Sequence, residues 1–184
     1  MTISYSILAK LPPLSSPVMF SPMGGRVSRE GLIVGFEGIG IDSWVGVFTA
    51  EATSLNKLLP HPNKEYVLVI SGGLVYVIDP KNRNVVQQIG GDIIYAELLP
   101  NRKGFLLGNG MDLEMHQADG FSWRTPRISW DGMRNIEIID DSLTGEAYSP
   151  LDNGWHNFRV NLLSGSCENS IYESEFSQFV PIKR

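Results

Sequence analysis

The sequence predicts an all-β fold made of repeated four-stranded antiparallel meanders. From about residue 55 onward, three stretches of about 40 residues repeat the same order of short apolar runs and turns, a period typical of propeller blades. Nineteen glycines and eleven prolines punctuate runs rich in Val, Ile, Phe, Tyr and Trp. Helix signals are scarce: only 49–59 has a plausible start, with Thr49 as the N-cap. Together these observations favour strands separated by tight turns.

The first repeat covers about residues 55–91. Leu59-Pro60 closes its first strand, and Ser71-Gly72-Gly73 and Asp79-Pro80-Lys81-Asn82 are predicted turns. Glycine supplies the positive φ that such turns need, and proline is excluded from central strands. The remaining strands are predicted at 66–70, 74–78 and 85–89.

The second repeat covers about residues 92–132. Its first strand ends at Leu99-Pro100, and its other strands are predicted at 105–107, 113–116 and 123–128. The third covers 133–172, with strands at 135–138, 143–148 and 155–163 and a closing strand at 170–172. Asp79, Asp119 and Ser164-Gly165 occupy the same turn of successive repeats. In the third repeat, apolar Phe158, Val160 and Leu162 alternate with polar residues, as expected of a half-buried strand.

The first 54 residues form a more irregular unit. Prolines interrupt its beginning, and strands are predicted at 5–8, 32–36 and 44–48, which together make a degenerate fourth module. We expect residues 1–184 to form a single domain that ends in a tail at 173–184. Three or four modules favour a minimal propeller ring, an open arc or half of a dimer, and a two-sheet β-sandwich or open barrel is the alternative.

Charge and composition narrow the functional classes. The net charge is −5, and the longest basic grouping is Lys183-Arg184, so the chain lacks the basic cluster of a nucleic-acid-binding protein. No apolar run is long enough to span a bilayer, and no signal-peptide pattern opens the chain. The single cysteine, Cys167, suits a reducing compartment. We therefore expect a cytoplasmic protein with no nucleic-acid or membrane partner.

The sequence shows no catalytic or metal-binding motif. His61, His116 and His156 lie in different repeats without the spacing of metal ligands. Neither a nucleophile elbow nor a phosphate-binding loop is present, and Cys167 has no cationic neighbour that would activate it. We expect no metal, no cofactor and no catalytic residue, which favours a non-enzymatic role.

The stretch 123–131 has the most unusual composition, with two tryptophans, two arginines and one aspartate. Such residues can form an aromatic and cationic platform for a sugar, a peptide or an anion. The alternative is structural: the tryptophans pack between sheets, and Arg127 pairs with Asp131 or Glu137. The candidate binding residues are Trp123, Arg127, Trp130, Asp131, Trp155 and His156.

Four segments resemble a group of small bacterial β-repeat proteins of unknown function. They span roughly residues 60–165 and comprise 71–79, 127–132, 145–150 and 155–162. The chain is similar, more loosely, to blades of the quinoprotein and WD-like type. It lacks their Gly-His and Trp-Asp pairs at the usual positions, because its Trp130-Asp131 stands at a module junction. The resemblance implies a β-repeat and a bacterial origin, and it implies no activity.

Two functional hypotheses follow from these observations. The first is a non-enzymatic interaction protein that presents loops of a β-repeat to a protein partner or to a second copy, for example an immunity-type protein that neutralises a toxin. The second is a small-ligand or sugar-binding module, or a hydrolase-like enzyme, with its site near Trp123–Asp131. Exposure of Trp123, Trp130 and Trp155 in one shared cleft would favour the second hypothesis.

Overall fold

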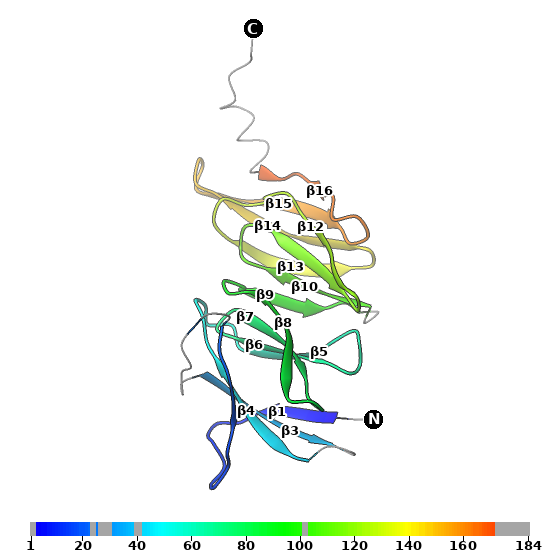
Figure 1. The fold of residues 1–184 in the computed structure, drawn as a ribbon. Coiled ribbons are helices and arrows are strands. Elements are labelled where there is room, and N and C mark those ends of the chain that lie inside the picture. Colours follow the sequence, from blue (N-terminus) through cyan, green and yellow to red (C-terminus); the bar gives the residue numbers. More distant parts are fainter. Residues whose placement is uncertain (1–2, 23–24, 26–30, 39–41, 101–102, 172–184) are drawn as a thin grey trace. The chain divides into compact units, whose positions relative to one another are not determined.

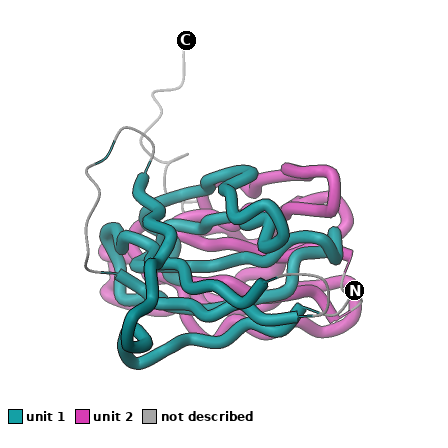
Figure 2. Tube along the Cα trace, turned by 60° about the horizontal axis from the view of Figure 1, so that its bottom comes forward, with its two compact units in different colours: residues 1–94 teal, residues 95–184 magenta. Residues whose placement is uncertain are grey.

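The computed structural model describes residues 3–22, 25, 31–38, 42–100 and 103–171. Within these residues, sixteen strands form four four-stranded sheets (Figure 1). The predicted all-β fold is confirmed, and the four separate, mostly antiparallel sheets are consistent with propeller blades. The chain divides into two compact units, residues 1–94 and 95–184, each containing two sheets (Figure 2).

The first sheet differs from a simple meander. Its strands lie in the order β1-β3-β4-β2, and β2 pairs in parallel with β4, whereas the other pairs are antiparallel. The connection between β1 and β2 therefore runs from one edge of the sheet to the other. The strands are β1 (Ile3–Ile7), β2 (Val18–Phe20), β3 (Gly31–Gly38) and β4 (Trp44–Thr49).

The second sheet is an antiparallel meander. Every residue of β6 is buried, as is every residue of β7 except the last. Gly72 and Gly73 join these two strands with φ values of +55° and +84°, conformations that glycine adopts at low cost. The strands are β5 (Lys57–Pro60), β6 (Val67–Ser71), β7 (Leu74–Asp79) and β8 (Asn84–Gly90).

The helix start predicted at Thr49 is wrong. Thr49 ends β4, and the last three residues of the predicted helix, 57–59, belong to β5. Tertiary hydrogen bonds explain the difference, because the Tyr76 hydroxyl donates to the Thr49 carbonyl at 2.8 Å. The Thr53 N–H likewise donates to the Gly72 carbonyl at 2.9 Å. These long-range bonds override a weak local preference for helix.

Aromatic rings form much of the core of the first unit. Phe36 stacks on Trp44 with 4.2 Å between ring centroids, and Phe48 stacks on Phe20 at 4.7 Å. The Trp44 indole N–H donates to the Pro80 carbonyl at 2.9 Å, so its buried polar atom is satisfied. Strands of both sheets of this unit contribute to the cluster.

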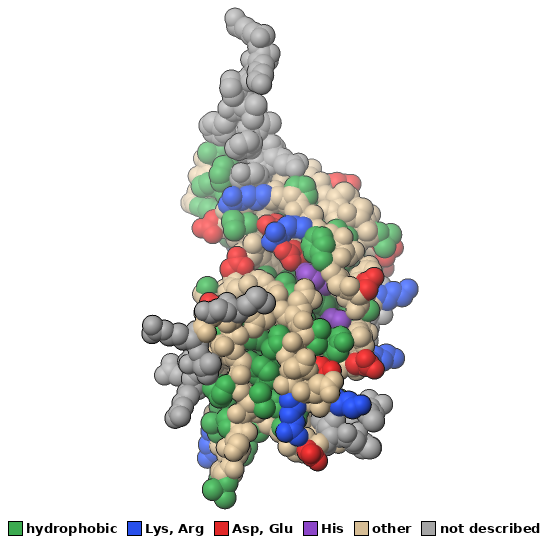
Figure 3. All heavy atoms as spheres, in the orientation of Figure 1, with side chains coloured by type: hydrophobic (Ala, Val, Ile, Leu, Met, Phe, Trp, Pro, Cys, Tyr) green, Lys and Arg blue, Asp and Glu red, His purple; other side chains and the backbone are tan. Residues whose placement is uncertain are grey.

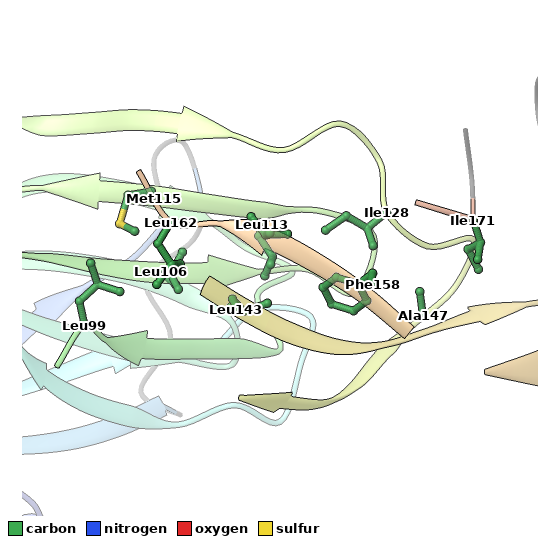
Figure 4. Close-up of a cluster of buried hydrophobic side chains, with 11 residues drawn as sticks. Leu99, Leu106, Leu113, Met115, Ile128, Leu143, Ala147, Phe158, Leu162 and Ile171 are labelled. Atoms are coloured by element: carbon green, nitrogen blue, oxygen red, sulfur yellow. The ribbon is translucent and has the colours of Figure 1, made fainter. Parts of the chain in front are cut away.

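The second unit contains two antiparallel meanders. The third sheet consists of β9 (Tyr95–Leu98), β10 (Gly104–Gly108), β11 (Leu113–Gln117) and β12 (Gly120–Arg124). The fourth consists of β13 (Met133–Ile139), β14 (Ser142–Ser149), β15 (Gly154–Asn161) and β16 (Cys167–Glu168). Leu106, Leu113, Leu143 and Phe158 belong to the buried cluster that these two sheets share (Figure 4).

Two strands of this unit differ from their predicted ranges. The strand predicted at 123–128 stops at Arg124, and the chain beyond it bonds to the loop before β11: Ile128 N–H donates to the Met111 carbonyl at 2.8 Å. The closing strand predicted at 170–172 lies instead at 167–168. Ser170 is buried, and its hydroxyl donates to the Arg127 carbonyl at 2.8 Å. Residue 172 lies outside the described residues.

The prediction that Asp79, Asp119 and Ser164-Gly165 occupy equivalent turns is confirmed. Asp79 is the last residue of β7, the third strand of its sheet, and Asp119 and Ser164-Gly165 lie between the third and fourth strands of theirs. Asp79 accepts hydrogen bonds from the N–H groups of Lys81 and Asn82, both at 2.9 Å. The carboxylate thus closes the turn, as expected of an Asx-turn.

Candidate functional site

The fourth sheet has one face in the core and one polar face. Along β14, Leu143, Gly145, Ala147 and Ser149 are buried, whereas the other four residues of the strand are partly exposed. This alternation has the period of two expected of a strand that covers a core on one side only. The strand register places side chains of β13 and β15 beside the partly exposed residues of β14. We call this surface the polar face; it includes Arg134, Glu146, Tyr148, Trp155, Asn157 and Arg159.

An arginine stacked on a tryptophan is the main feature of the polar face. The Arg134 guanidinium carbon lies 4.2 Å from the centroid of the Trp155 ring, within the range of a cation–π interaction. The Tyr148 ring lies 5.4 Å from that of Trp155. Its hydroxyl donates to Asn153 at 2.7 Å. The three side chains come from three neighbouring strands and form one cluster.

An ion pair holds Arg134 in this position. Its Nε donates to a carboxylate oxygen of Glu146 at 2.9 Å, and the Asn135 side-chain amide donates to the same oxygen. The hydrogen bond from Arg134, followed by that from Asn135, lowers the pKa of the Glu146 carboxyl below its usual value. Glu146 is therefore anionic at neutral pH, and it orients the guanidinium over Trp155.

A shallow groove of about 410 Å³ lies beside this cluster. Most of its described lining residues are polar in type, and Arg159 is the one cationic residue among them. The Arg159 Nη2 donates to the Ser142 hydroxyl at 2.8 Å. The groove is lined by Asn135, Glu137, Thr144, Gly145, Glu146, Asn157, Phe158, Arg159 and Asn169.

Among the predicted site residues, Trp123 lies on β12 and packs against the core of the second unit. Its indole N–H donates to the Leu162 carbonyl at 3.1 Å. A Cβ added at Gly165 would lie 2.7 Å from its ring, so the ring fits closely over the turn between β15 and β16. Trp123 thus links the third sheet to the fourth.

Arg127, Trp130 and Asp131 lie in the connection between β12 and β13. Arg127 donates to the carbonyls of Ser129, at 3.0 Å, and Trp130, at 2.7 Å, and its guanidinium carbon lies 5.8 Å from the Trp130 ring centroid. Trp130 also packs against the core, and Asp131 is exposed. These contacts fold the connection into a compact loop.

The end of this loop lies near Trp155. A Cβ added at Gly132 would be 3.7 Å from the Trp155 ring. The buried Ser129 hydroxyl lies 2.6 Å from the Gly132 carbonyl, to which it donates, and accepts from the Tyr148 N–H at 3.1 Å. The structure therefore brings the 127–132 loop beside the cluster on β14 and β15.

His156 lies next to Trp155 on β15 and contacts the preceding turn. Its Nε2 is 2.9 Å from an Asp152 carboxylate oxygen, and both side chains are substantially exposed. The hydrogen bond with His156 is the main cause that lowers the pKa of Asp152 below its usual range. An exposed pair of this kind contributes little to stability and mainly fixes the turn.

Sequence reasoning missed Arg134, Glu146 and Tyr148. The alternation of Thr144, Glu146 and Tyr148 with small or apolar residues was the available signal, since it places all three on one face of a strand. Arg134 was not predictable, because a β-bulge between Arg134 and Glu137 changes the register of β13.

Two further observations concern other kinds of site. Among the residues that the structure describes, no three His, Cys, Asp or Glu side chains gather closely enough to hold a metal ion. No helix in the described part of the chain is long and apolar enough to cross a membrane.

Comparison with known proteins gives no family. No family model matches the sequence, and no curated protein is significantly similar to it. A solved structure described as "Crystal structure of the eukaryotic initiation factor" aligns with 75% of this chain at 13% identity and a TM-score of 0.47. The alignment covers 39% of that chain. The class of the protein comes from its own structure: it is an all-β chain whose described residues form four four-stranded sheets.

Proposed function

We propose that this chain is a non-catalytic interaction protein that binds a protein partner through the polar face of its fourth sheet. The stacked pair of Arg134 and Trp155 carries the proposal. Tryptophan, tyrosine and arginine dominate the energetics of protein interfaces, and here all three lie in one cluster on a partly exposed surface.

The local geometry supports a preformed contact surface. Glu146 fixes Arg134, and Asn153 accepts from Tyr148, so the cluster has little side-chain freedom to lose when a partner binds. The neighbouring groove offers amide, carboxylate and guanidinium groups that can hydrogen-bond to polar groups at the rim of the partner's contact surface. An immunity-type role is one form of this proposal, in which the partner is a toxin.

The geometry of the cluster fits a small-ligand or sugar site less well than a protein-binding surface. The Arg134 guanidinium lies over the Trp155 ring, so a sugar stacking on that face would have to displace it. Trp123 and Trp130 both pack against the core. A glycan array on the full chain tests this alternative: specific glycan binding that Trp155→Ala abolishes would replace the protein-interaction proposal.

Site-directed photo-crosslinking tests the proposal. A benzophenone amino acid replaces Asn157, an exposed residue on β15, and the labelled chain is irradiated in a lysate of its source. We expect a discrete protein adduct that Arg134→Ala abolishes. Arg83→Ala is the matched control, because its side chain is 42% exposed against 48% for Arg134.

Binding measurements with the purified partner then give the size of the affinity loss. Loss of a hot-spot arginine costs at least about 2 kcal/mol, so Arg134→Ala should weaken binding about 30-fold, whereas Arg83→Ala should leave it unchanged. Absence of an adduct, or an adduct that Arg134→Ala does not affect, would refute this role for the polar face.

A further inference from the structure

The turn between β14 and β15 contains a sequence that is prone to a chemical change. Asn153 is followed by Gly154, one of two Asn-Gly pairs in the chain; the other is Asn109-Gly110. In such a pair the backbone nitrogen of the second residue can attack the side-chain amide of the first, and glycine leaves that nitrogen unhindered because it has no Cβ. The surroundings of the pair decide how fast this reaction is.

A carboxylate contacts the nitrogen that would attack. The Gly154 N–H donates to the Asp152 Oδ1 at 3.0 Å. The other carboxylate oxygen, Oδ2, lies 2.9 Å from the His156 Nε2, so the carboxylate is held from both sides. The hydrogen bond with His156 also lowers the pKa of Asp152, and the group is therefore ionised from about pH 5 upward. Asp152 can thus accept the proton that the Gly154 nitrogen loses.

A hydroxyl contacts the amide that would be attacked. The Tyr148 hydroxyl donates to the Asn153 Oδ1 at 2.7 Å. This oxygen gains negative charge when the nitrogen adds to Cγ, so the hydroxyl lies where charge develops. The Tyr148 ring is held by its contact with Trp155, with 5.4 Å between ring centroids. The turn therefore places a proton acceptor on the nucleophile and a hydrogen-bond donor on the electrophile.

The exposure of this turn meets the other requirements of the reaction. Residues 151–153 are exposed, so water reaches the amide and the backbone can rotate to bring the nitrogen onto Cγ. The other pair differs, because Gly110 is buried. The Asn109 Oδ1 also accepts from the N–H groups of Met111, at 3.0 Å, and Asp112, at 3.1 Å. These contacts fix the Asn109 turn, so we expect folding to protect it.

We propose that Asn153 is a site of self-catalysed deamidation, with Asp152 as the proton acceptor and Tyr148 as the stabilising donor. The Gly154 nitrogen forms a bond to the Asn153 Cγ as its proton passes to the carboxylate. The Cγ–Nδ2 bond then breaks, and the nitrogen takes up that proton and leaves as ammonia. Water opens the resulting five-membered imide at either carbonyl, and the product is aspartate or isoaspartate.

The product changes the polar face at its edge. Tyr148 belongs to that face, and in the aspartate product the oxygen to which it donates is part of a carboxylate. Figure 3 shows acidic and basic side chains interspersed on the visible face of the second unit, so the added charge acts mainly on its immediate neighbours. The deamidation itself does not depend on the partner-binding role of the polar face.

Peptide mapping by mass spectrometry of the full chain, incubated at neutral pH, tests the proposal. The same chain unfolded in guanidinium chloride gives the rate of the sequence without the folded geometry. We expect folding to accelerate the deamidation of Asn153 about tenfold and to slow that of Asn109. Deamidation of Asn153 that is no faster in the folded chain than in the unfolded chain would overturn the proposal.

Three variants identify the groups that act. Asp152→Asn keeps an oxygen that accepts the Gly154 N–H but removes the base, and Tyr148→Phe removes the donor. Each should slow the folded chain about tenfold, less than the roughly hundredfold effects of enzyme active sites, because this carboxylate is a weak base and the turn is exposed. Leu151→Ala, at an exposed residue of the same turn, is the matched control and should leave the rate unchanged.

The pH dependence distinguishes a chemical role of Asp152 from a structural one. With the carboxylate as the base, the rate should be nearly constant from about pH 5 to about pH 7, because Asp152 is ionised throughout this range. In Asp152→Asn the rate should instead rise with the hydroxide concentration. A natural chain whose rate follows hydroxide, or an Asp152→Asn or Tyr148→Phe chain that reacts as fast as the natural one, would overturn the proposal.

Discussion

At some turns of this protein, close packing against an aromatic ring determines which residue is possible. Trp123 and Gly165 are the clearest example, because the tryptophan ring occupies the space that a side chain at residue 165 would need. Gly165 also has a φ of +72°, so both backbone and packing require glycine there. The sequence alone suggested only a turn at this position.

Gly165→Ala should therefore destabilise the protein through two effects. The left-handed conformation costs an alanine about 1 kcal/mol, and displacement of the Trp123 ring adds about 1–2 kcal/mol more. Urea unfolding, monitored by tryptophan fluorescence, measures the change in the free energy of unfolding. The control is the same Gly165→Ala substitution in a Trp123→Ala background, where the ring is gone and only the backbone cost at φ +72° applies. Equal losses in the two variants would contradict the proposed contact.

Burial patterns distinguish the strands at the scale of elements. β6 and β7 are buried on both faces and consist of nearly continuous apolar residues, whereas β14 alternates because only one of its faces covers the core. The apolar runs and the alternation are both visible in the sequence, which is why these strands were predicted well. The parallel pairing of β2 with β4 has no such signal.

A buried tyrosine on β7 joins the second sheet to the end of β4. The Tyr76 hydroxyl donates to the Thr49 carbonyl at 2.8 Å, and burial, together with the negative charge of Glu51, raises its pKa to about 12. The folded state thus holds this proton more tightly than the unfolded chain, in which tyrosine has a pKa near 10. Its contribution to stability is complete below pH 10 and is lost as the pH rises from 10 to about 12.

Tyr76→Phe should lower the free energy of unfolding at neutral pH by about 1 kcal/mol, because one hydrogen bond is lost. The variant should also lose less stability than the natural chain between pH 10 and 12. Thermal unfolding at a series of alkaline pH values measures both effects. Tyr148→Phe, which removes an exposed hydroxyl, provides the comparison. An unchanged alkaline dependence in Tyr76→Phe would show that other groups determine it.

At the scale of the whole molecule, the described residues form two buried apolar clusters, one in each compact unit. In the second unit, strands from both sheets converge on Phe158, Leu143 and Leu113 (Figure 4). Neither sheet can bury its apolar face alone, so the repeat is stable only when neighbouring sheets pack together.

Phe158→Ala tests the cluster of the second unit. Truncation of a phenylalanine that is 2% exposed should cost about 3–5 kcal/mol and accelerate amide hydrogen exchange in β14 and β15. Phe121→Ala, at a residue that is 59% exposed, should cost less than about 1 kcal/mol. Unchanged exchange in β14 and β15 after Phe158→Ala would rule out a central role for this ring.

The sequence by itself determined the fold class, the repeat and most turns, because these depend on local patterns: the period of two along a strand, and glycine and aspartate at turn positions. It also drew attention to Trp155 and to the loop from Arg127 to Asp131. Only the tertiary structure placed Arg134, Glu146 and Tyr148 beside Trp155, since their proximity depends on strand register and on a bulge. It also showed that Leu14 is exposed and has a positive φ, because leucine gives no local signal for that conformation and exposure depends on the tertiary fold.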